Sequence, residues 1–145
     1  MNNAFVAGIS AALMAFSLVG CTHPATHTAA KTDAVCTVGD PMVQTTLYFG
    51  LSRAGGPDIS NTQWQNFVDQ DVTPRFRDGL TVFDARGQWL GNDGKLAKEG
   101  SKALMLIHSN EPAENQKIET LRTIYKTRFA QDSVMRVDDT VCVGF

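Results

Sequence analysis

The sequence is short of the residues on which recognisable chemistry depends. It has three cysteines and three histidines among 145 residues, and no Ser-His-Asp, Cys-His or metal-ligand spacing connects them. It carries no cofactor-binding motif, so neither a cofactor nor a metal is predicted. The 13 Lys and Arg against 15 Asp and Glu give a net charge of −2, without the basic patch that nucleic-acid binding requires. Nucleic acid is therefore excluded as an expected partner.

Charge is also absent from the first twenty residues, where an apolar run covers residues 4–20. The run is slightly shorter than the roughly 20 residues of a membrane-spanning helix. It ends in Leu18-Val19-Gly20-Cys21, which resembles the lipobox of bacterial lipoprotein precursors, although the usual Lys or Arg is missing from the start of the chain. The alternative is that Cys21 is an ordinary small residue near a standard signal cleavage site.

The lipobox resemblance implies a signal peptide over residues 1–20 and a lipidated Cys21. A diacylglycerol group and an N-acyl chain such as palmitate would be expected on this residue. Several acyl chains together give stable anchoring, because one chain alone binds a membrane only marginally. We therefore expect a protein of the bacterial cell envelope, lipid-anchored with its domain outside the cytoplasm.

Residues 21–40 are predicted to be a flexible tether, followed by a domain over residues 41–145. The segment from Thr22 to Asp33 is rich in Thr and Ala and has no apolar periodicity. His23 and His27 have the spacing of two metal ligands on one helix face. Pro24 disfavours such a helix, and two ligands do not close a metal site. A solvated linker is the favoured interpretation.

Apolar patterns in the domain predict four strands and two helices. Residues 45–52 alternate between apolar and polar side chains, as in a half-buried strand. The capping-box sequence Ser60-Asn61-Thr62-Gln63 opens a helix that is expected to end near residue 72. A strand over residues 80–90, with a bulge at Gly87, leads to the turn Asn92-Asp93-Gly94. The remaining elements are a strand at residues 103–107, a helix after Pro112 striped by Ile118, Leu121, Tyr125 and Phe129, and a strand at residues 133–145.

The element order is therefore β-α-β-β-α-β, which belongs to the α+β class. It predicts a ferredoxin-like sandwich, in which a four-stranded antiparallel sheet has two helices on one face. Right-handed crossovers give the spatial strand order 4-1-3-2. The first and last strands are then neighbours, which brings Cys36 close to Cys142. With Cys21 lipidated, these two form an even pair in an exported protein, so a disulfide is favoured over two buried thiols.

Three sequence blocks resemble a bacterial family of unknown activity. They are TTLYFGLSRAGGPDIS, TPRFRDGLTVFDARGQWL and DDTVCVGF, and they occur in the family's order. On these blocks the region from about residue 45 to residue 145 is similar to domain of unknown function 3574. The resemblance implies a small, exported and often lipid-anchored protein, and it carries no established activity or catalytic residue.

A small-anion site is the sharpest site hypothesis. In the predicted topology, one end of the sheet gathers cations, two glycines and the start of the first helix. Free helix amides and closely approaching backbone could there hold a carboxylate or phosphate. The alternative is that the glycines shape a turn while the cations are solvated. The residues of the hypothesis are Arg53, Gly55, Gly56, Ser60, Lys102 and Arg136.

Other polar residues offer weaker candidates. Tyr48 and His108 could form an acid–base pair if both face one pocket, although a lone His at a strand end is more often an ordinary polar residue. Asp138 and Asp139 are adjacent in a strand and therefore point to opposite faces, which prevents them from sharing a substrate proton. Trp89, on the hairpin, is expected to be the more exposed of the two tryptophans.

Two classes of function remain. The favoured one is a lipid-anchored binding or interaction module that uses the open sheet face or the hairpin. The alternative is a small-molecule enzyme of the dimeric ferredoxin-like type, with a pocket on the open sheet face. An enclosed pocket with His108, Tyr48 or Arg53 would favour the enzyme, whereas a flat face with exposed apolar side chains would favour association. The expected partners are the membrane through the anchor, and a protein partner or a second copy in a homodimer.

Overall fold

The computed structural model describes residues 36–90 and 94–145. Predictions that concern residues 1–35, among them the signal peptide, Cys21, His23 and His27, lie outside the described residues. The elements in chain order are β1 (Asp40–Gly50), α1 (Asn61–Phe67), the π-helical turn η1 (Val68–Val72), β2 (Thr81–Leu90), β3 (Leu96–His108), α2 (Pro112–Phe129) and β4 (Met135–Val143).

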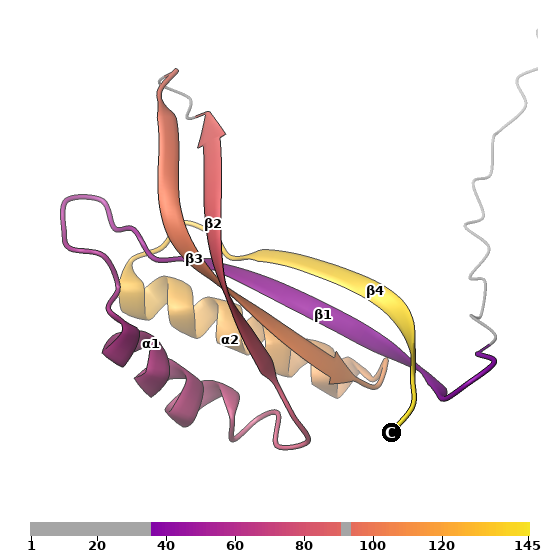
Figure 1. Ribbon diagram of the computed structural model, residues 1–145. Coiled ribbons are helices and arrows are strands. Elements are labelled where there is room, and N and C mark those ends of the chain that lie inside the picture. The colour runs from indigo at the N-terminus through magenta and orange to yellow at the C-terminus, as the bar shows by residue number, and fades with distance from the viewer. Residues whose placement is uncertain (1–35, 91–93) are drawn as a thin grey trace, which may run out of the picture. The chain divides into compact units, whose positions relative to one another are not determined.

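The four strands form one antiparallel sheet in the order β2-β3-β1-β4 (Figure 1). Both helices lie against the same face of the sheet, and the described residues leave the opposite face uncovered. The predicted α+β class, ferredoxin-like architecture and strand order are confirmed. We call the uncovered side the open face and the other side the helix face.

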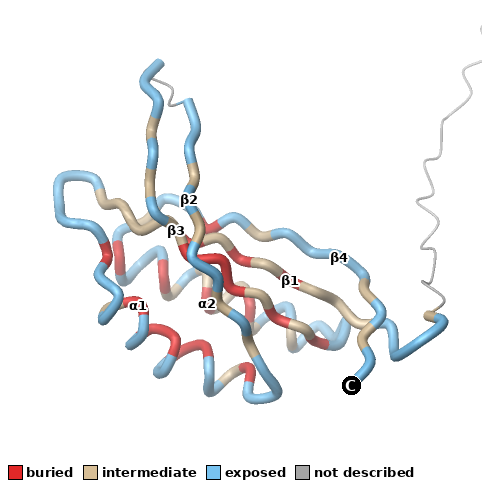
Figure 2. The backbone as a smooth tube through the Cα atoms, in the orientation of Figure 1, coloured by how far each residue is buried: buried red, intermediate tan, exposed pale blue. Residues whose placement is uncertain are grey.

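The core lies between the sheet and the helices because alternate strand residues point to the helix face (Figure 2). Leu47 and Phe49 of β1 are fully buried there. The Phe49 ring lies 5.2 Å from the Trp64 ring, 5.5 Å from Phe67 and 4.6 Å from Tyr125, measured between centroids. Tilted and edge-on aromatic pairs of this kind contribute about 0.5–1.5 kcal/mol beyond the area that they bury. This cluster holds both helices to the sheet.

Local signals set the ends of the helices. The predicted capping box is formed: the Ser60 hydroxyl accepts from the Gln63 backbone N–H at 3.2 Å, and the Gln63 side chain accepts from the Ser60 N–H at 3.0 Å. Pro112 begins α2, where its missing N–H costs no helical hydrogen bond. Ala130 ends α2 in the left-handed conformation, with φ of 53°.

β1 and β3 are longer than their sequence patterns predicted, whereas β2 and β4 are slightly shorter. β1 begins at Asp40 instead of residue 45, because pairing with the end of β4 extends it. The predicted bulge at Gly87 is absent: this residue pairs in continuous register with Glu99, and open space surrounds it. Pairing of β3 with β1 stops at Ser101, so beyond this row β2 and β3 pair only with each other. We call this protruding ribbon, residues 86–90 and 96–100, the arm (Figure 1).

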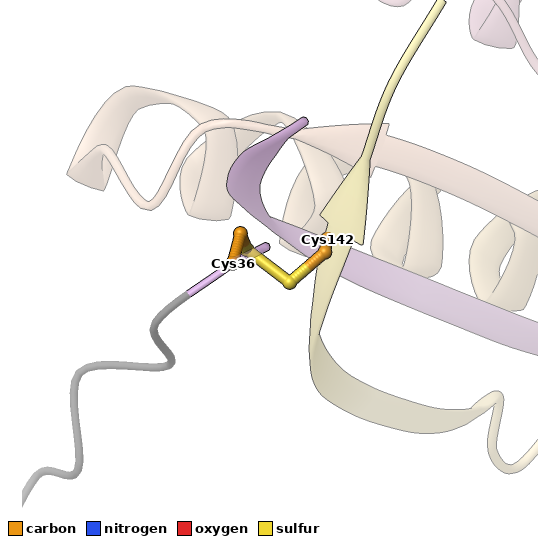
Figure 3. The surroundings of a disulfide bond; sticks show 2 residues. All are labelled: Cys36 and Cys142. Atoms are coloured by element: carbon orange, nitrogen blue, oxygen red, sulfur yellow. A yellow bond between two sulfur atoms is a disulfide. The ribbon is translucent and has the colours of Figure 1, made fainter. Parts of the chain in front are cut away.

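A disulfide joins Cys36 to Cys142 (Figure 3), with 5.5 Å between their Cα atoms. The predicted pairing is therefore present. Cys142 lies in β4 opposite Pro41 of β1, so the neighbouring strands bring the two cysteines together. Residues 36–40, which the sequence assigned to the tether, are held by this bridge and by the start of β1.

Candidate functional site

The loop between β1 and α1 is a self-contained turn. The Arg53 Nε donates to the Pro57 carbonyl oxygen at 2.8 Å, and the Gly56 N–H donates to the Arg53 carbonyl oxygen at 3.5 Å. Gly55 has a φ of 73°, a conformation that glycine adopts without strain. Gly55 and Gly56 thus shape a turn, as the alternative to the anion hypothesis stated. The side chain of Ser60, the next member of that hypothesis, is occupied by its capping box.

The three cations of the hypothesis do not meet. Lys102 pairs with Asp84 of β2, and Arg136 pairs with Asp138 at 2.9 Å and with Glu119 of α2 at 2.8 Å. Arg53, Lys102 and Arg136 line three separate surface hollows. The predicted grouping at one end of the sheet is therefore corrected. The cations are kept apart because the strand register places a carboxylate beside each strand cation, Asp84 beside Lys102 and Asp138 beside Arg136.

Tyr48 and His108 are likewise kept apart. In β1, Tyr48 lies between the buried Leu47 and Phe49, so its side chain points to the open face. His108 pairs across strands with Val43, which has the parity of Leu47 and therefore belongs to the helix face. The expected acid–base pair is not formed, because the two side chains lie on opposite sides of the sheet.

A buried polar network that the sequence reasoning did not identify connects three strands. The fully buried Thr45 hydroxyl donates to Asp138 Oδ1 at 2.5 Å and lies 2.8 Å from Nε2 of His108. The other ring nitrogen of His108 lies 2.8 Å from the Ser109 carbonyl oxygen. Arg136 extends the network to Glu119 and, at 2.6 Å, to Asn115 of α2. The sequence did indicate a buried Thr45, because this residue lies two positions before Leu47 and therefore points to the same face of the strand.

Charge pairing governs the ionisation of this network. Burial raises the pKa of Asp138, but hydrogen bonds from Thr45 and Arg136 outweigh burial and hold that pKa below its ordinary value. The same balance lowers the pKa of Glu119, which accepts hydrogen bonds from Arg136 and Arg122. For Arg136 burial lowers the pKa, and its two carboxylate partners raise it above the ordinary value. Both carboxylates are therefore held in their charged form by partners that they already have.

The network borders an open hollow of about 560 Å³ beside β4 and the start of α2. Thr45 is fully buried, so its hydroxyl is out of a substrate's reach. His108 contacts the Thr45 hydroxyl, but Asp138 contacts the threonine and not the histidine, so the carboxylate–histidine–hydroxyl order of a catalytic triad is not formed. Among the described residues, no buried side-chain polar atom lacks a hydrogen-bond partner. The arrangement accounts for cohesion between β1, β3 and β4 and gives no catalytic constellation.

The open face carries exposed apolar side chains that the strand register aligns across the sheet. Strand register places Phe83, Ala103, Tyr48 and Met135 in one row across all four strands. The adjacent row consists of Thr81, Met105, Thr46 and Val137. We call these eight residues the apolar belt. Its large side chains are about half exposed: Phe83 by 51%, Met135 by 56% and Val137 by 49%.

Beyond the belt, the open face continues in both directions. Trp89 of the arm shares the parity of Phe83 and is 50% exposed, in agreement with the expectation for this tryptophan. At the other end the face borders a hollow of about 610 Å³ that includes Met105 and Ile107, with Phe76 from the loop after η1. Four charged residues also line this hollow: Arg75, Asp78, and the ion pair of Glu114 with Lys117, whose charged atoms are 2.6 Å apart. Apolar surface therefore extends from the arm to the far end of the sheet.

Charged residues are sparse on the open face. By strand parity its described strand residues include three carboxylates, Asp40, Glu99 and Asp139, and no Lys or Arg. All three lie at the margin: Asp40 at the start of β1, Glu99 on the arm and Asp139 on the edge strand β4. Large exposed apolar patches on otherwise soluble domains mark sites of association. The open face is thus the candidate functional site of the described domain.

The described residues give no sign of a metal centre or a membrane-spanning helix. No cluster of three or more His, Cys, Asp or Glu side chains within residues 36–90 and 94–145 could hold a metal ion. No helix in these ranges combines the length and apolarity that crossing a bilayer requires.

Residues 44–145 match the family described as "Protein of unknown function (DUF3574)", and the chain belongs to this family. Among curated proteins, none matches the chain. Its fold is similar to that of a phage SAM lyase solved with S-methyl-5'-thioadenosine, with a TM-score of 0.54, 16% identity and coverage of 76% of this chain and 96% of that one. The apo form of the phage SAM lyase gives a TM-score of 0.54 at 16% identity, with 77% and 98% of the two chains covered.

A further solved structure, CutA from Synechococcus elongatus, has a TM-score of 0.49 and 8% identity, with 72% of this chain and 81% of that chain covered. At such identities the similarity to the phage enzyme concerns the fold alone.

Proposed function

We propose that this protein is a lipid-anchored component of the bacterial cell envelope whose domain is a binding module, with the open sheet face as its protein-binding surface. The observation that carries the proposal is the apolar belt, in which Phe83 of β2 and Met135 and Val137 of β4 are about half exposed and Tyr48 and Met105 lie partly exposed between them. The cost of leaving this belt in water is removed when a partner covers it, at about 25 cal/mol per Å² of apolar surface.

Two further observations support the location. The disulfide between Cys36 and Cys142 is of the kind that persists in oxidising compartments outside the cytoplasm. The lipobox-like sequence ending at Cys21 supports an anchor at the start of the mature chain. An interaction module held at a membrane surface meets its partners at a high effective concentration, so that a modest intrinsic affinity suffices.

An enzyme is supported less well. The alternative requires a pocket that gathers polar groups able to act on a substrate. His108 lines the hollows of about 560 Å³ and about 610 Å³, and Arg53 lines a different one, so these side chains do not gather in one pocket, and all three hollows are open to solvent. The geometry therefore favours binding over catalysis.

Site-specific photo-crosslinking in living cells tests the proposal. A photo-reactive amino acid at position 83 of the full-length chain, in place of the half-exposed Phe83, should give a protein adduct of defined mass. The same amino acid at position 116, in place of the exposed Gln116 on α2, is the matched control on the helix side. If position 83 gives no adduct, or no more than position 116, the open face is not a protein-binding surface.

A further inference from the structure

The composition of the open face identifies its partner. We propose that the partner is a second copy of this chain, bound face to face with its strands running in the opposite direction. The apolar belts of the two copies then lie against each other, and each arm lies over the far end of the other copy's sheet. This inference rests on the proposed function, because it assigns a partner to the same surface.

The two ends of the open face are complementary. One end presents Trp89, an aromatic side chain that projects half exposed from the arm. The other end presents the hollow of about 610 Å³, in which the apolar side chains of Phe76, Met105 and Ile107 lie beside charged residues of the rim. A large aromatic side chain seated in such a hollow is a typical anchor of a protein interface. Each copy thus supplies one anchor and one receptor.

Trp89 cannot reach the hollow of its own chain. It pairs with Ala97 near the start of β3, whereas the hollow lies beside Ile107 near the strand's end. The ten residues between these two positions span about 33 Å of extended strand. A two-fold axis through the apolar belt instead brings Trp89 of each copy toward the hollow of the other. Such isologous contacts are formed twice and close on themselves, as in most dimers.

Charge favours a second copy over a membrane or a nucleic acid. Both of those surfaces are anionic and attract cationic faces, whereas the strands of the open face carry no Lys or Arg among their described residues, and the cations beside the hollow, Arg75 and Lys117, are paired with Asp71 and Glu114. The carboxylates of these strands, Asp40, Glu99 and Asp139, lie at the margin and leave the belt uncharged. Because the belt has no charged side chain, two copies of it can pack together without burying a charge. By the strand register the face presents about twenty residues, the number that each side of a standard interface contributes.

The arm gives an independent reason for a partner. A two-stranded ribbon on its own is marginally stable in water, because it buries little apolar surface. The arm nevertheless exposes Leu90 and Leu96 on one side and Trp89 on the other. A second copy that covers the Trp89 side supplies the burial that the arm's own chain does not.

Crosslinking between two distinguishable copies tests the arrangement. One full-length copy carries a photo-reactive amino acid at position 89, and a co-expressed full-length copy carries an affinity tag. We expect an adduct with twice the mass of one chain, joined to the tagged copy within residues 75–80 or 105–109. Position 88, on the other side of the arm, is the matched control and should not give this product.

A substitution on the arm tests the energetics. Trp89 is half exposed and outside the core, so Trp89→Ser should leave the fold intact. Removing an interface anchor of this kind should raise the dimer dissociation constant at least tenfold, as measured by sedimentation of the full-length protein in non-ionic detergent. Gln88→Ser, the matched control, should leave the constant unchanged.

The outcomes separate this inference from the proposed function. Adducts from position 83 to a different protein would uphold the binding surface and overturn the second copy. Adducts from position 83 to the tagged copy, with position 89 joined elsewhere or nowhere, would overturn the antiparallel arrangement. A full-length protein that sediments as a monomer at all concentrations also overturns the second copy.

Discussion

Asp138 and Asp139 are neighbours in the chain with opposite surroundings. Asp138 lies on the helix face, where Thr45 and Arg136 donate hydrogen bonds to one of its oxygens. Asp139 lies on the open face, and its carboxylate accepts from the Thr140 backbone N–H at 2.8 Å. The alternation of side chains along β4 produces this difference from two identical residues. Asp138 and Asp139 can therefore serve as test and control when the contribution of the Thr45 network to stability is measured.

Asp138→Asn is expected to lower stability at neutral pH and to flatten the loss of stability in acid. The pKa of Asp138 is lowered in the folded state, so its contribution is complete above the unfolded-state value of about 4 and is lost as the pH falls through the folded-state value. Urea unfolding between pH 7 and pH 2 measures the effect, with Asp139→Asn as control. Identical pH profiles for the Asp138→Asn variant and the wild type would contradict the prediction.

Thr45→Val should destabilise the domain by about 1–3 kcal/mol, because it leaves buried polar groups of the network without their shared hydroxyl. The substitution preserves shape, so little of the loss can come from packing. Thr46→Val changes the neighbouring residue of the open face and should alter the free energy of unfolding by less than about 0.5 kcal/mol. Equal effects of the two substitutions would show that the Thr45 hydroxyl has no special role.

At the scale of elements, β1 and β4 are joined both by hydrogen bonds and by the Cys36–Cys142 bridge. The bridge spans 106 residues, so it removes a large part of the freedom of the unfolded chain. We expect the double variant Cys36→Ser, Cys142→Ser to lose roughly 2–5 kcal/mol in the free energy of unfolding. Urea titration of the full-length protein in detergent measures this loss. If a reductant left the urea midpoint of the wild-type protein unchanged, the prediction would be contradicted.

Patterns of apolar residues predicted the elements and their order because these patterns depend on local geometry alone. The period of 2 identified β1 and β2, the period of 3.6 identified α2, and the handedness of crossovers then fixed the strand order. The pairs Lys102–Asp84 and Arg136–Glu119 depend on the register of strands and on helix placement, which no local pattern encodes. The predicted cation cluster failed for this reason. The length of the arm was also missed, since its polar and apolar residues alternate weakly.

At the scale of the whole molecule, the proposed anchor and the open face would act together. A lipid on Cys21 would confine copies to a membrane plane, which raises the effective concentration at which their open faces meet. We predict that Cys21→Ala releases the protein from the membrane fraction or leaves it unprocessed. Detergent partitioning and the mass of the mature N-terminal residue measure this. A wild-type protein that is recovered soluble with an unmodified N-terminus would rule out the anchor.

The disulfide also defines a mechanical load path. A pulling force that arrives along the chain from the N-terminal side enters the described domain at Cys36 and passes through the covalent bridge to Cys142, three residues before the C-terminus. The sheet and both helices lie within the loop that the bridge closes, so tension between the chain ends bypasses them. A domain held by the proposed anchor could be pulled through it without being unfolded, until a reductant opened the bridge.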